Sequence, residues 1–411
     1  MKSGVAITGI GVLSPIAIGR DAYWDRLFQG RTGFRPITLF DTSNYRVNIA
    51  GEITEFDPLP FLGKKGLREL DRSTRLICSA AKLAIDDSRI EITEHNTHSM
   101  GVSIGTTFGS LHSISQFDRS GLTDGPRYVN PSHFPNTVIN SPASQVSIRF
   151  KIKGFNTTIS TGFCASLDAV SYAADFIRLN RADVVFAGGV EELCEETFMG
   201  FHGFGCLSGM DGSAPMSCPF DARRNGIILS EGAGVLVLED EKYAVDRGAS
   251  ILALVIGYGN AFDPSAGKSF DHAGKGLQSA IKIALRESSL EPEDIDYICS
   301  GANSTTGLDR METGVIRNVF GEHAFKIPAS SIKSMIGESF SASGALSLAA
   351  AVGTLQKDLV PPTINYQERD PACDLDYVPN SARTRRIQNI LVTAADPYGQ
   401  NSAVILGRYA G

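Results

Sequence analysis

Short apolar runs alternate with amphipathic stretches along the whole chain, and this alternation constrains the fold more than any other feature. In residues 165–180, for example, apolar side chains recur every three to four positions, as one face of a helix requires. Similar helical stretches are expected at 74–86, 274–288 and 342–357. The runs that predict strands are 5–10, 101–105, 184–189, 234–238, 252–258, 297–299 and 390–394. Buried strands that alternate with helices predict an α/β fold whose sheets are partly parallel.

A coarse internal duplication divides the chain into two parts. Segments 5–10 and 252–258 are both strand-like, and each leads into a glycine-rich turn. We therefore expect two related halves, residues 1–250 and 251–411, which pack as one body because no Pro/Ser-rich linker separates them. Within the first half, residues 106–147 predict a long, loop-rich insertion, which either contacts a partner or the substrate or is only surface.

The composition is that of an ordinary soluble enzyme, with 42% hydrophobic and 20% charged residues and a net charge of -7. The mild acidity argues against nucleic acid or an anionic membrane as the main partner. No apolar stretch reaches the roughly 18 residues of a membrane-spanning helix. The seven cysteines form no C-x-x-C pair and the N-terminus has no signal-peptide pattern, so we expect a cytoplasmic protein. The histidines lack the spacing of metal ligands, so we expect no metal site.

Cys164 is the candidate nucleophile because of its place in the predicted structure. A strand-like stretch, 156–160, precedes it, and a helix is expected to begin at Ala165. A sharp turn there would expose the sulfur, and a helix N-terminus favours the thiolate, which can carry an acyl group as a thioester. The position alone leaves another interpretation open, in which Cys164 is a small buried residue.

Several motifs, in the same order and at similar spacing, resemble those of the β-ketoacyl-acyl-carrier-protein synthase family. They are TGFCAS at 161–166, AGGVE at 187–191, PFDARRNG at 219–226, SEGAG at 230–234 and KSMIG at 333–337. The resemblance covers essentially the whole chain. It implies a five-layered α-β-α-β-α thiolase fold built from two related halves, and an obligate dimer. It also implies acyl chains delivered on the phosphopantetheine arm of an acyl carrier protein, with no bound cofactor.

The two histidines of the family's active site are both replaced. The first, in the motif H-G-T-x-T, falls on Gly301, and Asp309 and Glu312 set the register of that comparison. The second, which follows K-S-M-T-G, falls on Glu338. An ionised carboxylate accepts hydrogen bonds and donates none, so Glu338 would repel a developing oxyanion that a histidine would stabilise.

Other family positions outline the rest of the site. Lys333 and Glu312 are both present, and we expect them to form a structural ion pair in its floor. Thr305 matches one of two threonines that hold the pantetheine arm in the family, and Asn303 replaces the other. The remaining substrate-binding positions have lost two family phenylalanines, at Ile227 and Pro397, and continue through Tyr398 and Gly399.

Two functions are compatible with this pattern. The first is a chain-length-factor-type subunit, which forms a heterodimer with a paralogous, active ketosynthase and shapes the acyl tunnel. Such subunits serve type II polyketide, polyene or fatty-acid-like chain elongation. The alternative is a catalytically altered ketosynthase or acyltransferase that uses Cys164 as acyl acceptor and Glu338 as general base. Loss of both histidines favours the subunit, whereas retention of Cys164 favours the enzyme.

Overall fold

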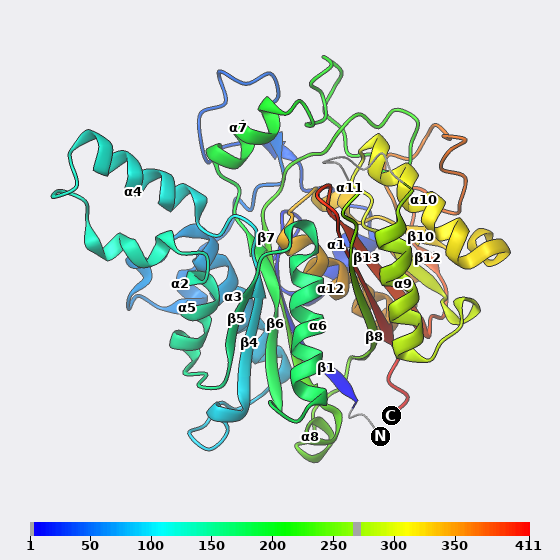
Figure 1. The fold of residues 1–411 in the computed structure, drawn as a ribbon, viewed down its shortest axis with the longest axis horizontal. Coiled ribbons are helices and arrows are strands. Elements are labelled where there is room, and N and C mark those ends of the chain that lie inside the picture. Colours follow the sequence, from blue (N-terminus) through cyan, green and yellow to red (C-terminus); the bar gives the residue numbers. More distant parts are fainter. Residues whose placement is uncertain (1–3, 266–272) are drawn as a thin grey trace.

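The computed structural model describes residues 4–265 and 273–411, in which ten strands form one mixed sheet (Figure 1). From one edge to the other the strands are β10 (Ala329–Ser330), β9 (Tyr297–Cys299), β13 (Asn389–Ala395), β14 (Gln400–Gly407), β8 (Ala253–Phe262), β1 (Val5–Leu13), β7 (Gly232–Asp240), β6 (Val184–Glu191), β4 (Met100–Gly105) and β5 (Asn156–Ile159). Each of the seven expected strands is present, and β5 coincides with the strand-like stretch expected before Cys164.

The same strand order occurs twice in this sheet. Only the strands of this sheet are counted here, in chain order within each half. In each half the first strand pairs with the fifth, the fifth with the fourth, the fourth with the second and the second with the third. The senses agree as well, because β4 is parallel to β5 and β6, and β9 is parallel to β10 and β13. The halves meet where β1 pairs with β8 over two residues. The repeat confirms the predicted thiolase fold of two related halves, while the boundary at residue 250 stays a prediction.

Two helices pack between the halves and two more cover the outer faces, which produces the expected α-β-α-β-α layers. The inner helices are α6 (Ala165–Arg178) and α12 (Ser341–Lys357), and each contacts strands of both halves. On the outside, α3 (Arg72–Ser88) covers β1 and β7, and α9 (Lys275–Ser288) covers β8 and β14 (Figure 1). Every residue of α12 from Ser341 to Leu355 is buried, as a helix enclosed on all sides must be.

The remaining described elements are short or peripheral. The helices among them are α1 (Arg20–Phe28), α2 (Leu59–Leu62), α5 (Ser141–Phe150), α7 (Glu195–Gly203), α8 (Glu241–Asp246), α10 (Thr306–Phe320) and α11 (Lys333–Ile336). The strands among them form two small ribbons, β2 (Arg35–Pro36) with β3 (Ile49–Ala50) and β11 (Leu359–Val360) with β12 (Arg383–Thr384). No helix in the described ranges is both long and apolar enough to cross a bilayer.

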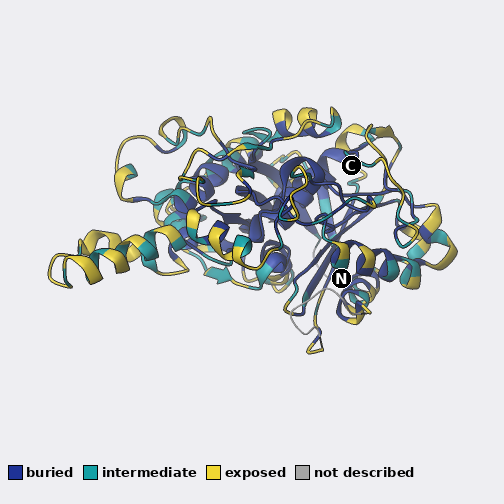
Figure 2. Ribbon diagram, turned by 90° about the horizontal axis from the view of Figure 1, so that it is seen from above, coloured by how far each residue is buried: buried dark blue, intermediate teal, exposed yellow. Residues whose placement is uncertain are grey.

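The prediction of a loop-rich insertion at 106–147 is wrong, because much of this segment is helical. It contains α4 (Leu111–Thr123), the 3-10 helix Pro131–Thr137 and the beginning of α5. The serines and glycine of α4 have low intrinsic helix propensity, which hid the helix in the sequence. No residue of α4 is buried, and the segment extends from the body as an arm (Figure 2).

Small residues let the inner helices approach each other closely. A Cβ added at Gly344 of α12 would lie 2.6 Å from Ser166 Oγ and 2.8 Å from Leu167 Cγ. Gly353, further along α12, allows the close approach of α1 instead, since an added Cβ would lie 2.6 Å from the Trp24 ring. The Gly- and Ala-rich sequence of α12 therefore sets the spacing of the central layer.

We expect Gly344→Ala to lower the melting temperature, because overpacking of this kind costs about 1–3 kcal/mol. Gly314→Ala on α10 is the matched control, since a Cβ there meets nothing within 4 Å. That control should be neutral or stabilising by about 0.5–1 kcal/mol, the usual gain from replacing a helical glycine. Differential scanning fluorimetry measures both, and a Gly344→Ala protein as stable as wild type would contradict the close packing.

Candidate active site

Cys164 ends a 3-10 turn, Gly162–Cys164, and directly precedes α6. Gly162 has a φ of +61°, and a Cβ there would lie 2.1 Å from Asp396 Oδ2, so the turn requires glycine. The Gly162 carbonyl accepts a hydrogen bond from Thr107 Oγ1 at 3.0 Å. The turn between strand and helix therefore lies where the sequence predicts it.

The expectation that this turn exposes the sulfur is wrong, because Cys164 is completely buried. Burial is the main reason that the pKa of the Cys164 thiol lies well above its ordinary value, and the carboxylates of Asp168 and Asp396 raise this pKa further. Lys333 lowers the pKa and Glu338 raises it. The helix N-terminus is thus outweighed, and the neutral thiol is the stable form at neutral pH.

Glu338 is a buried carboxylate whose two oxygens each accept two hydrogen bonds. Its Oε2 accepts from Lys333 Nζ at 2.8 Å and from Asn303 Nδ2 at 3.0 Å. Its Oε1 accepts from Ser343 Oγ at 2.8 Å and from the Phe340 backbone N–H at 3.0 Å. Four donors fill the acceptor positions of an ionised carboxylate. Glu338 therefore has no proton to donate and no lone pair left for a substrate proton.

The predicted ion pair between Lys333 and Glu312 is wrong. Lys333 pairs with Glu338 instead, and its ammonium also donates to the Gly301 carbonyl at 2.9 Å. Glu312 accepts from Ser300 Oγ at 2.6 Å and from the Gly301 N–H at 3.1 Å. The reason is electrostatic: a carboxylate at position 338 brings a second buried negative charge into the site, and such a charge needs a close counter-ion.

Gly301 is buried, and hydrogen bonds fix both its N–H and its carbonyl group. Besides its bonds to Glu312 and Lys333, its N–H also donates to Thr393 Oγ1 at 3.1 Å. A Cβ at Gly301 would lie 2.9 Å from the Thr393 carbonyl oxygen. A histidine side chain at this position would require the neighbouring strand β13 to move.

Asn303 and Thr305, the two positions expected to hold a pantetheine arm, are hydrogen-bonded to each other. Thr305 Oγ1 donates to Asn303 Oδ1 at 2.8 Å, while the Asn303 amide nitrogen donates to Glu338. Asn303 is buried and Thr305 is half-buried. Of this pair, only Thr305 is accessible to a ligand without rearrangement.

The loop 396–400 contributes an acid that was not singled out from the sequence. Asp396 accepts hydrogen bonds from the backbone N–H groups of Tyr398 at 2.7 Å and Phe163 at 3.3 Å. Burial raises the pKa of Asp396, and Glu338 raises it further. Pro397 and Gly399, with a φ of +103°, complete this tight loop, while Tyr398 is exposed. The signal for Asp396 was an acid at a position where the resembling family motif has glycine.

An aromatic cluster packs beside Cys164, and it too was not predicted. The Phe340 ring lies at its centre, 4.8 Å from Phe201, 5.2 Å from Phe163 and 5.4 Å from Phe108 between ring centroids. Phe340 has a φ of +46°, a backbone conformation that residues other than glycine rarely adopt. Ile227 belongs to the same buried apolar cluster. The site therefore combines a thiol, buried carboxylates, one ammonium group and an apolar wall.

Comparisons with known proteins agree with this architecture. Residues 2–244 match the family model "Beta-ketoacyl synthase, N-terminal domain", and residues 252–367 match "Beta-ketoacyl synthase, C-terminal domain". The chain is 36% identical to 3-oxoacyl-[acyl-carrier-protein] synthase 2 of Coxiella burnetii, with 99% of each chain covered. It is 38% identical to the tetracenomycin polyketide synthase ketoacyl synthase alpha subunit of Streptomyces glaucescens, over 98% of this chain and 97% of that protein.

Two solved structures are similar over the full length of both chains. The ishigamide ketosynthase/chain length factor has a TM-score of 0.93 at 32% identity. The complex AntDE:AntF, described as a type II PKS acyl-carrier protein with its ketosynthase bound to the hexaketide, has a TM-score of 0.91 at 28% identity.

We expect Cys164 to resist alkylation by iodoacetamide, because its raised pKa keeps the thiolate scarce. Its labelling rate should keep rising above pH 9, where a free cysteine, with a pKa of about 8.5, levels off. Asp396→Asn removes one carboxylate that raises this pKa, so it should speed labelling several-fold, whereas Asp118→Asn on the exposed arm should not. Peptide mass spectrometry follows Cys164, with Cys206 as an internal comparison. Labelling of Cys164 at pH 7 as fast as that of free cysteine would contradict the expectation.

Proposed function

This chain belongs to the β-ketoacyl synthase family, and from this premise we propose that it is a chain-length-factor-type subunit. In this role it forms a heterodimer with a paralogous, active ketosynthase and shapes the acyl tunnel during type II polyketide, polyene or fatty-acid-like chain elongation. One observation carries the proposal: Glu338, locked as a carboxylate by Lys333, stands where the family's catalysis needs a proton donor.

Condensation in this family passes through species that carry negative charge on an oxygen atom, and donors aimed at that oxygen supply much of the catalysis. Neither Gly301 nor Glu338 has a side chain that can donate. Lys333 is the nearby cation, but two of its three protons go to Glu338 and to the Gly301 carbonyl. Its charge is also offset by that of Glu338. The geometry thus supports a site that does not stabilise an enolate.

The alternative function, acyl transfer through Cys164, needs a base that takes the proton of the thiol. The acids near the sulfur all accept hydrogen bonds from other groups, and Glu338 has no acceptor site left. Glu338 accepts four hydrogen bonds, Asp396 accepts two from backbone N–H groups, and Asp168 accepts from Thr161 and Asn260. These contacts favour the subunit role, while the retained thiol is the one feature that favours acyl transfer.

The surface around β5 supports pairing with a second subunit. β5 is the last strand of the sheet, so its outer edge has no partner among the described residues. Next to it, Ile148 and Tyr172 are exposed, and the arm adds Leu122, Tyr128 and Phe134, each more than half exposed. An open strand edge beside apolar side chains is typical of an interface. An amphipathic 13-residue helix such as α4 is also stabilised mainly when its apolar face packs against another surface.

We propose that an acyl carrier protein delivers its phosphopantetheine-bound chain to the partner's cysteine, not to Cys164. Two features of this chain support that assignment. Asn303 already hydrogen-bonds Glu338 and Thr305, and Phe163, the residue before Cys164, packs against Phe340 in the aromatic cluster. The AntDE:AntF structure is by its description a complex of a carrier protein with such a ketosynthase.

The test is co-expression of this chain with a ketosynthase encoded beside it, followed by product analysis with malonyl-carrier protein. We expect a heterodimer in which Cys164→Ala leaves product formation within about twofold of wild type, as does the control Cys206→Ala. Alanine at the partner's nucleophile should abolish the product. Loss of product in Cys164→Ala, with the heterodimer intact, would instead identify this chain as an acyl-accepting enzyme.

A further inference from the structure

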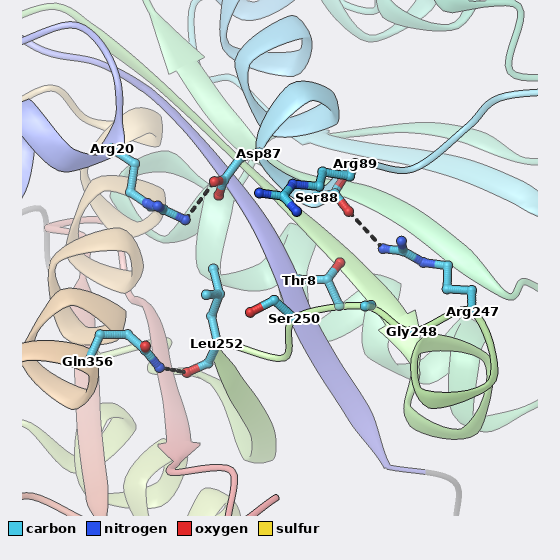
Figure 3. Close-up of a pocket in the computed structure, with 11 residues that line it drawn as sticks. Thr8, Arg20, Asp87, Ser88, Arg89, Arg247, Gly248, Ser250, Leu252 and Gln356 are labelled. Carbon is cyan, nitrogen blue, oxygen red and sulfur yellow. Dashed lines mark hydrogen bonds and ion pairs between the residues drawn. The ribbon is translucent and has the colours of Figure 1, made fainter.

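A cavity of about 620 Å³ lies where the two halves join. Its walls come from the β1–β8 junction, the C-terminal end of α3, the turn after α8 and the last turn of α12 (Figure 3). The volume falls within the roughly 300–1,000 Å³ of small-molecule sites. Nothing in the proposed function uses this cavity.

The cavity is remote from Cys164. Helix α12 begins next to Phe340 in the aromatic cluster and reaches the cavity with Gln356. Its 17 residues span roughly 25 Å at 1.5 Å per residue. The cavity is therefore a separate site at the opposite end of the central helix.

The charged side chains that line the cavity are predominantly cationic. Three of the described lining residues are arginines, Arg20, Arg89 and Arg247, and one, Asp87, is acidic. Arg20 pairs with Asp87 at 2.5 Å and with Asp21 at 2.9 Å, and Arg247 pairs with Glu239; Asp21 and Glu239 lie outside the lining. Among the described residues Arg89 has no ion pair or side-chain hydrogen bond, and it is exposed. One cationic group is thus left uncompensated.

Two of the arginines are held in place before any ligand arrives. The Arg20 guanidinium lies over the Trp24 ring, 5.0 Å from its centroid, while it is bonded to Asp87. Arg247 donates to Glu239 and, at 3.1 Å, to the Ser88 carbonyl. In Figure 3, Arg20 and Arg247 point inward from opposite sides, and the Arg89 side chain lies between them. Donors fixed in this way lose little conformational entropy on binding.

The chemistry of the walls selects the ligand class. A cation would be repelled by the Arg89 guanidinium, and an apolar ligand would bury Arg89 without a hydrogen bond. The C-terminus of α3 contributes about half a negative charge, but Arg247 already bonds its Ser88 carbonyl. Planar guanidinium groups match the oxygens of phosphate, to which they can donate in pairs.

We propose that this cavity binds a small phosphate-bearing ligand, either free phosphate or a phosphate ester, and that Arg89 contacts the phosphate group directly. The inference is independent of the proposed function, because it concerns other residues at a remote site.

The test is to measure, by calorimetry at constant ionic strength, the binding of inorganic phosphate and of methyl phosphate to the full chain. We expect saturable binding that Arg89→Gln weakens at least tenfold. The matched control is Arg68→Gln, an exposed arginine in the 3-10 turn before α3 and outside the cavity lining. This control should bind like wild type, and tighter binding of methyl phosphate than of phosphate would identify an ester as the ligand.

Three results would overturn the proposal. The first is the absence of binding beyond that of a chloride control. The second is an equal loss in Arg68→Gln, which would indicate general attraction to a positive surface. The third is tighter binding of citrate than of either phosphate probe, which would assign the cavity to a carboxylate ligand. Equal melting temperatures of the two variants in phosphate-free buffer check that both are folded.

Discussion

The buried ion pair between Lys333 and Glu338 is the interaction on which the rest of the site depends. Both side chains are almost fully inaccessible, and the charged atoms lie 2.8 Å apart. A single charge at this depth would cost several kcal/mol, so neither residue tolerates the loss of the other. Asn303, Ser343 and the Phe340 N–H complete the coordination of the carboxylate. The pair therefore keeps Glu338 ionised and draws Lys333 away from Glu312.

The Lys333–Glu338 pair changes the chemistry of the site, while the fold remains that of the family. The duplicated sheet and the buried helix α12 position the Cys164 turn, the Gly301 strand end and the 338–340 loop around one centre, as the fold of the family requires. Function resides in the residues placed on a fold rather than in the fold itself. Here the scaffold is kept while burial, Asp168 and Asp396 hold the thiol neutral. Such a combination suits a subunit that contributes shape to a complex.

Sequence periodicity predicted most strands of the sheet and the helices that pack on it, because each of them carries its own local pattern, whereas the layered arrangement followed from the motif resemblance. All seven expected strands, the inner helices and the turn at Cys164 are present. β14 was not assigned, although its apolar run 403–406 is a strand signal. The arm was missed because α4 has weak helix propensity and buries nothing, which obscured its amphipathic pattern.

The site was less predictable, since its properties depend on residues distant in sequence. The positions of Gly301 and Glu338 followed from motif spacing alone. The burial of Cys164 and the approach of Asp396 depend on how the two halves pack, whereas the choice of Glu338 over Glu312 by Lys333 depends on contacts within the second half. A helix N-terminus predicts a thiolate locally, but burial among carboxylates reverses that prediction. Charge pairing inside a core is a property of the assembled fold.

The most direct test of this account is the release of carbon dioxide from malonyl-acyl carrier protein by the purified chain without a partner. With the malonyl group labelled at its free carboxyl carbon, the account predicts release no faster than from the carrier protein incubated alone. An active ketosynthase measured in parallel provides the positive control. Release at a rate close to that control, accompanied by a longer β-ketoacyl chain, would contradict the claim that the Glu338 site cannot support condensation.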